Sequence, residues 1–277
     1  MNTAIWGCTF VVVKGALADA SPLPFLAVRF VLAGLLLLAI LGQGQVEGAA
    51  IFPGFVLGLF LFVGYLFQTY GLIYTTPSKS AFLTGFSVIL VPLIVMLAGS
   101  RMGSATLVGG VLGLAGIYLL VAPSGMAAVN RGDLLTLAGA FSFAVHIVLV
   151  GHYTKKFSFL HLVPAQILVV GLLASITLPL AAARSFHLTA RLAVAILVTA
   201  VLATGVAFSV QNWAQQYTPA AHTALIFALE PAFAALSSRL VMGEHFGGRA
   251  LAGSGLILAG MVVSEIWGGS VPSPVEG

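Results

Sequence analysis

Apolar runs of about twenty residues, the length that crosses a bilayer as one helix, fill this sequence almost from end to end. Of its 277 residues, 60% are hydrophobic and only 6% are charged. Soluble globular proteins have about 25% charged residues, so this chain cannot cover an ordinary water-facing surface. The composition predicts a membrane protein that crosses the bilayer many times. It excludes a large soluble domain, a disordered protein and a nucleic-acid-binding surface.

The runs predict an all-α polytopic fold with ten transmembrane helices. The expected ranges are 3–18, 24–42, 51–73, 79–98, 104–122, 132–152, 161–183, 191–215, 219–241 and 249–267. A linker is expected at 123–131, and the tail 268–277 is predicted to be disordered. One cysteine excludes a disulfide framework, and we expect no cofactor and no metal site.

Weak identities between the two halves predict an internal repeat. At an offset of 143 residues, Gln68, Tyr74, Thr75 and Ala81 fall on Gln211, Tyr217, Thr218 and Ala224; at an offset of 137, Ser21 and Gly34 fall on Ser158 and Gly171. One five-helix unit is therefore expected twice, in residues 1–122 and 132–267. Because five is odd, the second unit enters the membrane inverted. Such repeats place a substrate site near the midplane between the halves and permit alternating access.

Ionisable groups at membrane depth are costly and usually face a cavity or one another. Glu230 is expected halfway along its helix, before Pro231 and without an adjacent cation. Two functional interpretations are open, a proton-coupling carboxylate or a partner for a substrate ammonium group. The structural alternative is a buried ion pair with Lys14, Arg29 or Lys79. For Lys14 and Arg29 the alternative is snorkelling of the side chain to the headgroups.

Aromatic and amide residues are expected to line the transport cavity together with these charges. The predicted substrate-binding set is Trp6, Lys79, Phe82, Gln211, Trp213 and Glu230. An aromatic wall with a few polar groups suits a small amphipathic molecule. The alternative for Trp and Tyr is the interfacial belt of the membrane. His146 is interpreted as a core histidine rather than a ligand. Glycines such as Gly109 and Gly260 are expected to pack helices within the bundle or across a dimer.

Several segments resemble the EamA-type drug/metabolite transporters. The similarity is carried by Trp6-Gly7, Phe10 to Lys14, Ser21-Pro22, Arg29-Phe30, Ala81 to Gly85, Leu229-Glu230-Pro231, Gly243-Glu244 and Gly253 to Gly260. It implies a bundle of two inverted repeats in the inner membrane of a bacterium, exporting metabolites. The YddG-like exporters of aromatic and other neutral amino acids are the suggested subgroup. Gly99-Ser100-Arg101 stands where Gly-Glu-Arg is expected, so Glu244 lacks a symmetric partner.

The sequence thus predicts a secondary transporter that is not an enzyme and exports small metabolites, with neutral or aromatic amino acids as substrates. Its other partner is the lipid bilayer, and a monomer or weak dimer is expected. A multidrug or other metabolite exporter of the same fold is the main alternative. A passive channel is disfavoured because the polar residues are too few and scattered for a continuous polar pore. A hydrolase using Ser87 or Ser209 with His146 or His222 is disfavoured because neither serine stands in a nucleophile motif. The chain contains no phosphate-binding loop for ATP.

Overall fold

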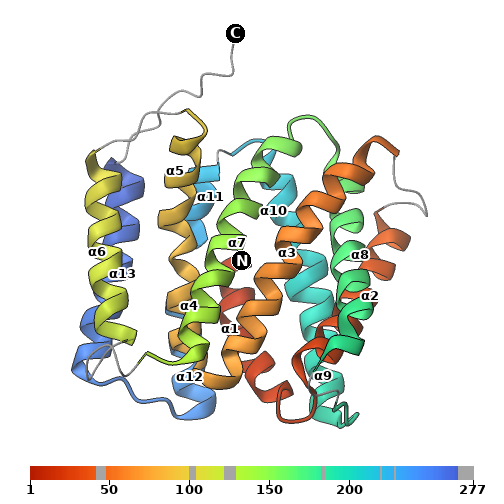
Figure 1. Ribbon diagram of the computed structural model, residues 1–277, viewed down its shortest axis with the longest axis horizontal. Helices are drawn as coiled ribbons and strands as arrows, with labels where there is room; N and C mark the ends of the chain where they lie inside the picture. Colours follow the sequence, from red (N-terminus) through yellow and green to blue (C-terminus); the bar gives the residue numbers. More distant parts are fainter. Residues whose placement is uncertain are drawn as a thin grey trace.

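The computed structural model describes residues 1–41, 48–99, 104–121, 129–181, 185–218, 220–227 and 229–267. In these residues the regular elements are all helical, which confirms the all-α prediction (Figure 1). Most of the predicted linker (123–128) and the predicted tail lie outside the described residues, as does Arg101.

The ten predicted segments are occupied by helices, some of them in two or three pieces. The helices are α1 (Asn2–Ala16), α2 (Pro22–Ile40), α3 (Gly48–Tyr74), α4 (Pro77–Gly85), α5 (Ser87–Leu97), α6 (Ser104–Val121), α7 (Arg131–Tyr153), α8 (Phe159–Thr177), α9 (Ala190–Val198), the π-helix η3 (Thr199–Val206), α10 (Ala207–Gln215), α11 (Ala220–Phe227), α12 (Glu230–Met242) and α13 (Gly248–Trp267). A short 3₁₀ turn, η2 (Leu178–Leu180), follows α8.

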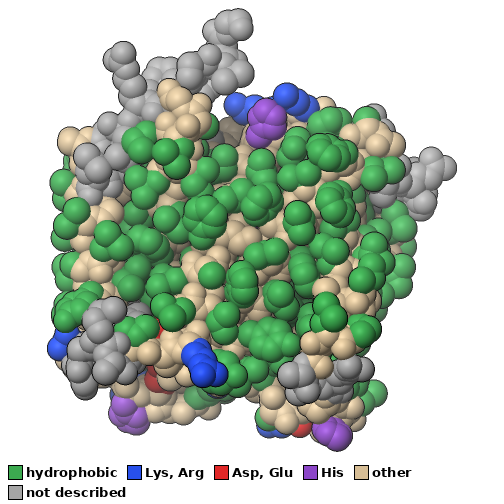
Figure 2. Space-filling view, viewed as in Figure 1, with side chains coloured by type: hydrophobic (Ala, Val, Ile, Leu, Met, Phe, Trp, Pro, Cys, Tyr) green, Lys and Arg blue, Asp and Glu red, His purple; other side chains and the backbone are tan. Residues whose placement is uncertain are grey.

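Within the described residues, six helical segments are long and apolar enough to cross a membrane. They are α2, α3, α4–α5, α7, the segment from α8 through η2, and the segment from α9 to α10. Two further apolar stretches, Val108–Leu119 and Gly248–Ser264, are shorter. Figure 2 shows apolar side chains covering the middle of the face in view, with charged and histidine side chains at its two ends. This distribution is the one a bilayer requires.

Two spans are broken at corresponding points. The N–H of Phe86, between α4 and α5, donates to the carbonyl of Leu83 at 3.2 Å. The N–H of Leu229, between α11 and α12, donates to the carbonyl of Ile226 at 3.3 Å. In both, the N–H donates to the carbonyl three residues back instead of four, and the offset between the two positions is again 143. Pro231 follows the second break; it lacks an N–H and so suits the first turn of a new helix.

The contacts between the two halves follow a pattern that is unchanged when the halves are exchanged. α2 packs on α8 and α6 on α13. α3 packs on α7, and the corresponding helices of the second half, α9 and α10, pack on α1. In the same way, α1 packs on α12 and α7 packs on α5. In Figure 1, α2 starts at the lower end of the bundle and its counterpart α8 starts at the upper end. These two helices therefore run in opposite directions.

Lys14 closes the end of α3. Its Nζ donates to the carbonyl oxygens of Leu72 at 2.6 Å, Ile73 at 3.1 Å and Thr75 at 3.0 Å. A helix leaves its last carbonyls without partners, and a lysine ammonium satisfies them and complements the helix dipole. Lys14 therefore ties α1 to α3, and its position is explained by neither snorkelling nor an ion pair with Glu230.

A second tie joins the α1–α2 turn to the start of α9. Arg191 donates from Nε and Nη2 to the carboxylate of Asp19 at 2.9 and 2.8 Å. These hydrogen bonds lower the pKa of Asp19 below its usual value, because they stabilise the ionised carboxylate. Arg191 is exposed and solvent screens its charge, so the pair fixes the position of the turn and contributes little stability.

Glycines bring α6 and α13 into backbone contact. A Cβ on Gly260 would lie 2.5 Å from the carbonyl oxygen of Gly109, and one on Gly116 would lie 2.5 Å from that of Gly253. Only glycine permits helices to approach this closely. In the structure these glycines pack helices within the bundle.

We expect Gly260→Ala to separate α6 from α13 locally, because a backbone carbonyl cannot move aside without its helix. Overpacking of this kind destabilises by about 1–3 kcal/mol, so the melting temperature in detergent should fall. Gly255→Ala on the same helix is the control: its Cβ meets no atom within 4 Å, and alanine favours the helix. Equal melting temperatures for the two variants would contradict this packing.

Candidate functional site

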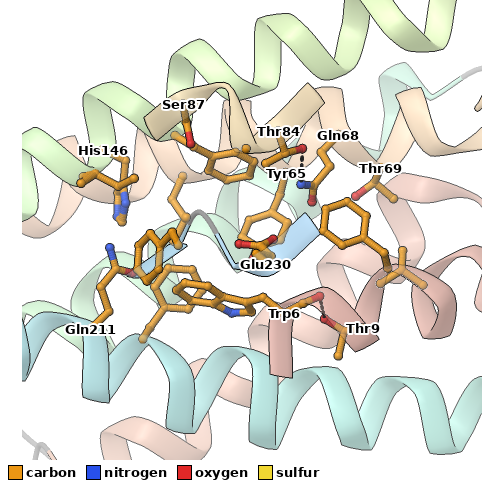
Figure 3. Close-up of a pocket in the computed structure, with 18 of the residues that line it drawn as sticks. Trp6, Thr9, Tyr65, Gln68, Thr69, Thr84, Ser87, His146, Gln211 and Glu230 are labelled. Atoms are coloured by element: carbon orange, nitrogen blue, oxygen red, sulfur yellow. Dashed lines mark hydrogen bonds between the residues drawn. The ribbon is translucent and has the colours of Figure 1, made fainter. Parts of the chain in front are cut away.

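A cavity lies between the two halves of the bundle (Figure 3). It has about 820 Å³ of empty space, its open mouth included. Its aromatic lining residues are Trp6, Phe10, Tyr65, Phe143, Phe208 and Phe227. The ring of Trp6 lies 5.3 Å from that of Phe208 and 5.0 Å from that of Phe227. Its indole N–H donates to the carbonyl of Ala203 in η3 at 2.8 Å, which fixes the ring.

Arg29 supplies the cavity's cation. The side chain is buried, with its guanidinium carbon 4.8 Å from the ring centres of both Phe30 and Tyr65. Nε donates to Thr204 at 3.1 Å, and Nη2 lies 3.5 Å from the Tyr65 hydroxyl. Nη1 has no acceptor among the described residues, yet it is not enclosed by protein. Because Arg29 lines the cavity, this nitrogen is available to an anionic group of a ligand.

Glu230 supplies the cavity's carboxylate and lies near its centre in Figure 3. It is the first residue of α12, where the positive end of the helix dipole favours a carboxylate. Gly7 lets α1 approach: a Cβ there would lie 2.6 Å from the Glu230 carbonyl oxygen. In the described part of the chain the ion pairs are Lys79–Asp133 and Arg191–Asp19. The ion pair of Glu230 with Lys14, Arg29 or Lys79, one interpretation of the sequence, is therefore not formed.

The cavity wall is built from corresponding residues of the two halves. At the offset of 137, Trp6, Thr9 and Phe10 correspond to Phe143, His146 and Ile147; at the offset of 143, Tyr65, Gln68, Thr84 and Ser87 correspond to Phe208, Gln211, Phe227 and Glu230. All fourteen line the cavity. The charged positions break this symmetry, because Glu230 corresponds to a serine and Arg29 corresponds to Gln166, which is not in the lining.

Three of the six residues predicted to bind substrate line this cavity: Trp6, Gln211 and Glu230. Phe82 is buried in a neighbouring apolar cluster with Leu83, outside the lining. Trp213 is 50% exposed and packs on Tyr217, with the ring centres 5.8 Å apart.

Lys79 belongs to a polar cluster at the α3–α4 turn, which we define as Ser78, Lys79, Asp133, Ser238 and Glu244. Nζ of Lys79 lies 2.9 Å from Oδ2 of the fully buried Asp133. The hydroxyls of Ser78 and Ser238 donate to the two carboxylate oxygens of Glu244. The cluster connects α4 of the first half with α7 and α12 of the second. It thus holds the halves together at the end of the bundle where α3 meets α4.

Neither serine proposed for a hydrolase is activated by the histidine of the cavity. Ser209 donates to the carbonyl of Gly205 in its own helix at 2.7 Å. Ser87 lines the cavity but has no hydrogen bond to His146 among the described residues, and the His146 Nε2 lies against Gln166 instead. The side chain of His222 lies outside the described residues.

Sequence reasoning missed Tyr65, Phe143 and Phe208 and left Arg29 ambiguous. The repeat held the signal: once Trp6 is assigned to the cavity, the offset of 137 points to Phe143. Gln68 and Gln211 in turn point to Tyr65 and Phe208, three residues before them on the same helix face. No sequence pattern separates a buried Arg29 from one that reaches the headgroups.

Comparison with known proteins gives two kinds of similarity. The sequence model of the EamA-like transporter family matches residues 1–122 and 130–265. An uncharacterized transporter of Archaeoglobus fulgidus is 36% identical over 265 residues, covering 95% of this chain and 82% of that protein. An uncharacterized transporter from Acidianus ambivalens, encoded in a sor 3′ region, is 29% identical over 45% of this chain and 48% of its own length. One crystal structure has the same fold, with a TM-score of 0.73 and 17% identity over 96% of this chain and 95% of the other.

We expect Lys79→Met to destabilise the protein by about 2 kcal/mol, because the buried carboxylate of Asp133 loses its cation. The double variant Lys79→Met/Asp133→Leu should recover part of this loss, since no unpaired charge remains. Arg191→Met, which removes the exposed partner of Asp19, is the control and should change the melting temperature little. If Lys79→Met melts like Arg191→Met, Asp133 does not depend on the pair.

Proposed function

The chain belongs to the EamA-like transporter family and is a multi-pass membrane protein, and from this premise we propose that it is a secondary transporter that exports neutral and aromatic amino acids by alternating access. One observation carries the choice of substrate. Among the described lining residues, Arg29 is the only Lys or Arg and Glu230 the only carboxylate, and the two are not paired with each other.

A zwitterion satisfies both charges at once. An unpaired charge at membrane depth is unfavourable, and a ligand that neutralises only one leaves the other exposed to the low-dielectric interior. The carboxylate of an amino acid would lie against Arg29 and its ammonium group against Glu230. A cationic drug or an anionic metabolite would leave one of these side chains without a partner. The charge pattern therefore favours amino acids over the multidrug alternative.

The aromatic wall supports an apolar substrate side chain. Trp6, Phe208 and Phe227 pack edge to face or tilted and present continuous apolar surface. Aromatic rings favour such contacts with other rings. Gln68 and Gln211 add polar groups to the wall. Gln68 donates one hydrogen bond to Thr84 at 3.1 Å and Gln211 donates one to Gln215 at 2.9 Å, which leaves each amide with further hydrogen-bonding capacity.

Alternating access is supported by the arrangement of the halves. The family model matches in two stretches, the matching helices α2 and α8 run in opposite directions, and fourteen lining residues form seven corresponding pairs. Related halves of opposite orientation can exchange conformations, which opens the site to each side in turn. The units proposed are residues 1–122 and 132–267. With no ATP-binding loop in the sequence, the driving force is a gradient of substrate or of a coupled ion. The proposed location is the inner membrane of a bacterium, on the basis of the resemblance alone.

Counterflow in proteoliposomes tests the substrate. Vesicles loaded with unlabelled phenylalanine, methionine or threonine should accumulate the same labelled amino acid from outside. Phenethylamine, which lacks the carboxylate, and 3-phenylpropanoate, which lacks the ammonium group, should compete at least about tenfold more weakly than phenylalanine, because each leaves one cavity charge unpaired. Strong competition by phenethylamine alone would favour a cationic drug as substrate. Absence of counterflow with every amino acid would refute the proposal.

The cavity variants have a matched control. Arg29→Met and Glu230→Gln should each reduce counterflow by about tenfold or more, because each removes one charge partner of the zwitterion. Trp6→Ala should also reduce it, since the wall loses its largest ring. Trp213→Ala removes an exposed tryptophan outside the cavity and should transport normally. Equal loss in both tryptophan variants would contradict the location of the site.

A further inference from the structure

His146 lines the cavity, but its role depends on residues behind it that do not. One ring nitrogen, Nε2, lies 2.8 Å from Oε1 of Gln166 in α8. Gln166 Nε2 donates to Oδ1 of Asn212 in α10 at 3.1 Å, and Asn212 Nδ2 donates to the carbonyl of Phe208 at 2.9 Å. Gln166 and Asn212 are fully buried, and His146 is 2% exposed.

This chain of hydrogen bonds has one consistent direction. The carbonyl of Phe208 can only accept, so it fixes the nitrogen end of the Asn212 amide. Asn212 Oδ1 then accepts from Gln166, which leaves Gln166 Oε1 facing the histidine. Because Oε1 is also only an acceptor, Nε2 of His146 must carry a proton. In the neutral ring, Nδ1 is therefore a hydrogen-bond acceptor.

The acceptor is open to the cavity. Figure 3 shows the ring of His146 directed from α7 toward the cavity. Nδ1 has no hydrogen-bond partner among the described residues. It is also absent from the set of buried side-chain atoms that lack a partner, so protein atoms do not enclose it. The charged groups that share this cavity are Arg29 and Glu230. A neutral His146 leaves their charges balanced and adds an uncharged acceptor to the wall.

We propose that Nδ1 of His146 accepts a hydrogen bond from the ammonium group of the substrate, so that the transporter selects ligands with an N–H donor over ligands of equal charge without one. The inference rests on the proposed function and adds a specificity residue to it. Glu230 attracts any positively charged group, whereas a hydrogen bond to Nδ1 requires an N–H donor on the ligand that points at this nitrogen. Glu230 and His146 come from the second half and Arg29 comes from the first. Different halves therefore bind the ammonium and carboxylate groups of the substrate.

The repeat supports this division. Gln166 is the counterpart of Arg29 at the offset of 137, and His146 is the counterpart of Thr9. In the first half, Arg29 contributes a cation directly to the cavity. In the second half, its counterpart Gln166 lies behind the cavity wall and orients His146. Two equivalent positions thus serve the two opposite ends of one dipolar ligand.

Binding measurements with a pair of ligands test the proposal. L-Phenylalanine and N,N,N-trimethyl-L-phenylalanine carry the same charges, but the second has no N–H donor. His146→Phe should weaken binding of phenylalanine by about tenfold, the usual effect of a hydrogen bond to a charged group, and change binding of the trimethyl form less than about twofold. Thr9→Val, at the equivalent position, is the control. Its hydroxyl donates to the Trp6 carbonyl at 2.8 Å, so both ligands should respond alike.

Gln166→Met keeps the histidine but removes the acceptor that fixes its proton. Phenylalanine should bind this variant several-fold more weakly, with the trimethyl form again unaffected. The ¹⁵N resonances of the His146 ring, assigned by their loss in a His146→Gln variant, should show a protonated Nε2 and a bare Nδ1 in the wild-type protein. In Gln166→Met the two tautomers should mix. A purely structural role of His146 does not predict the selective loss of phenylalanine binding.

The outcomes separate the two proposals. If wild-type protein binds phenylalanine and both ligands weaken equally in His146→Phe, His146 supports the fold and the inference is wrong, while the proposed function stands. A protonated Nδ1 in the wild-type protein would also overturn it. If wild-type protein binds and carries no amino acid, the proposed function fails, and the assignment of the ammonium donor fails with it.

Discussion

The fold depends on one constraint: a polar group inside a membrane bundle must find its partner within the protein or in a ligand, because the lipid offers none. Lys14 satisfies the last carbonyls of α3, the Trp6 indole satisfies a carbonyl of the π-helix, and Lys79 satisfies Asp133. These contacts also join helices that are distant in sequence. Three polar groups have no partner among the described residues and line one cavity: Nη1 of Arg29, the carboxylate of Glu230 and Nδ1 of His146. These three groups are where we propose that the ligand binds.

Symmetry builds the cavity, and departures from symmetry give it chemistry. Corresponding residues of the two halves, such as Gln68 and Gln211, surround one central space. A strictly symmetric wall would suit a symmetric ligand. Ser87 and Glu230 occupy equivalent positions, yet only one is ionisable. Such pairs give the site a positive and a negative side, and therefore an orientation for a dipolar substrate.

Residue patterns predicted the fold much better than the site, for a physical reason. Hydropathy reports each residue's preference for lipid, which is local, so the runs located the helices. The apolar runs could not show that the helices break at Phe86 and Leu229. At each break a backbone N–H donates to the carbonyl three residues back instead of four, and the surrounding sequence is apolar. Nor could they separate Trp6 from Trp213. Both are apolar aromatics in helices, and only packing puts one in the cavity and the other on the outer surface.

The sequence by itself determined that the chain is an all-helical membrane protein, and its offsets of 137 and 143 predicted a correspondence between its halves. These properties follow from composition and spacing, which need no partner residue. The tertiary structure decided which charges pair. Lys79 finds Asp133, Lys14 finds the end of α3, and Arg29 and Glu230 stay unpaired on one cavity. Pairing is set by which helix faces meet, and that depends on the packing of the whole bundle.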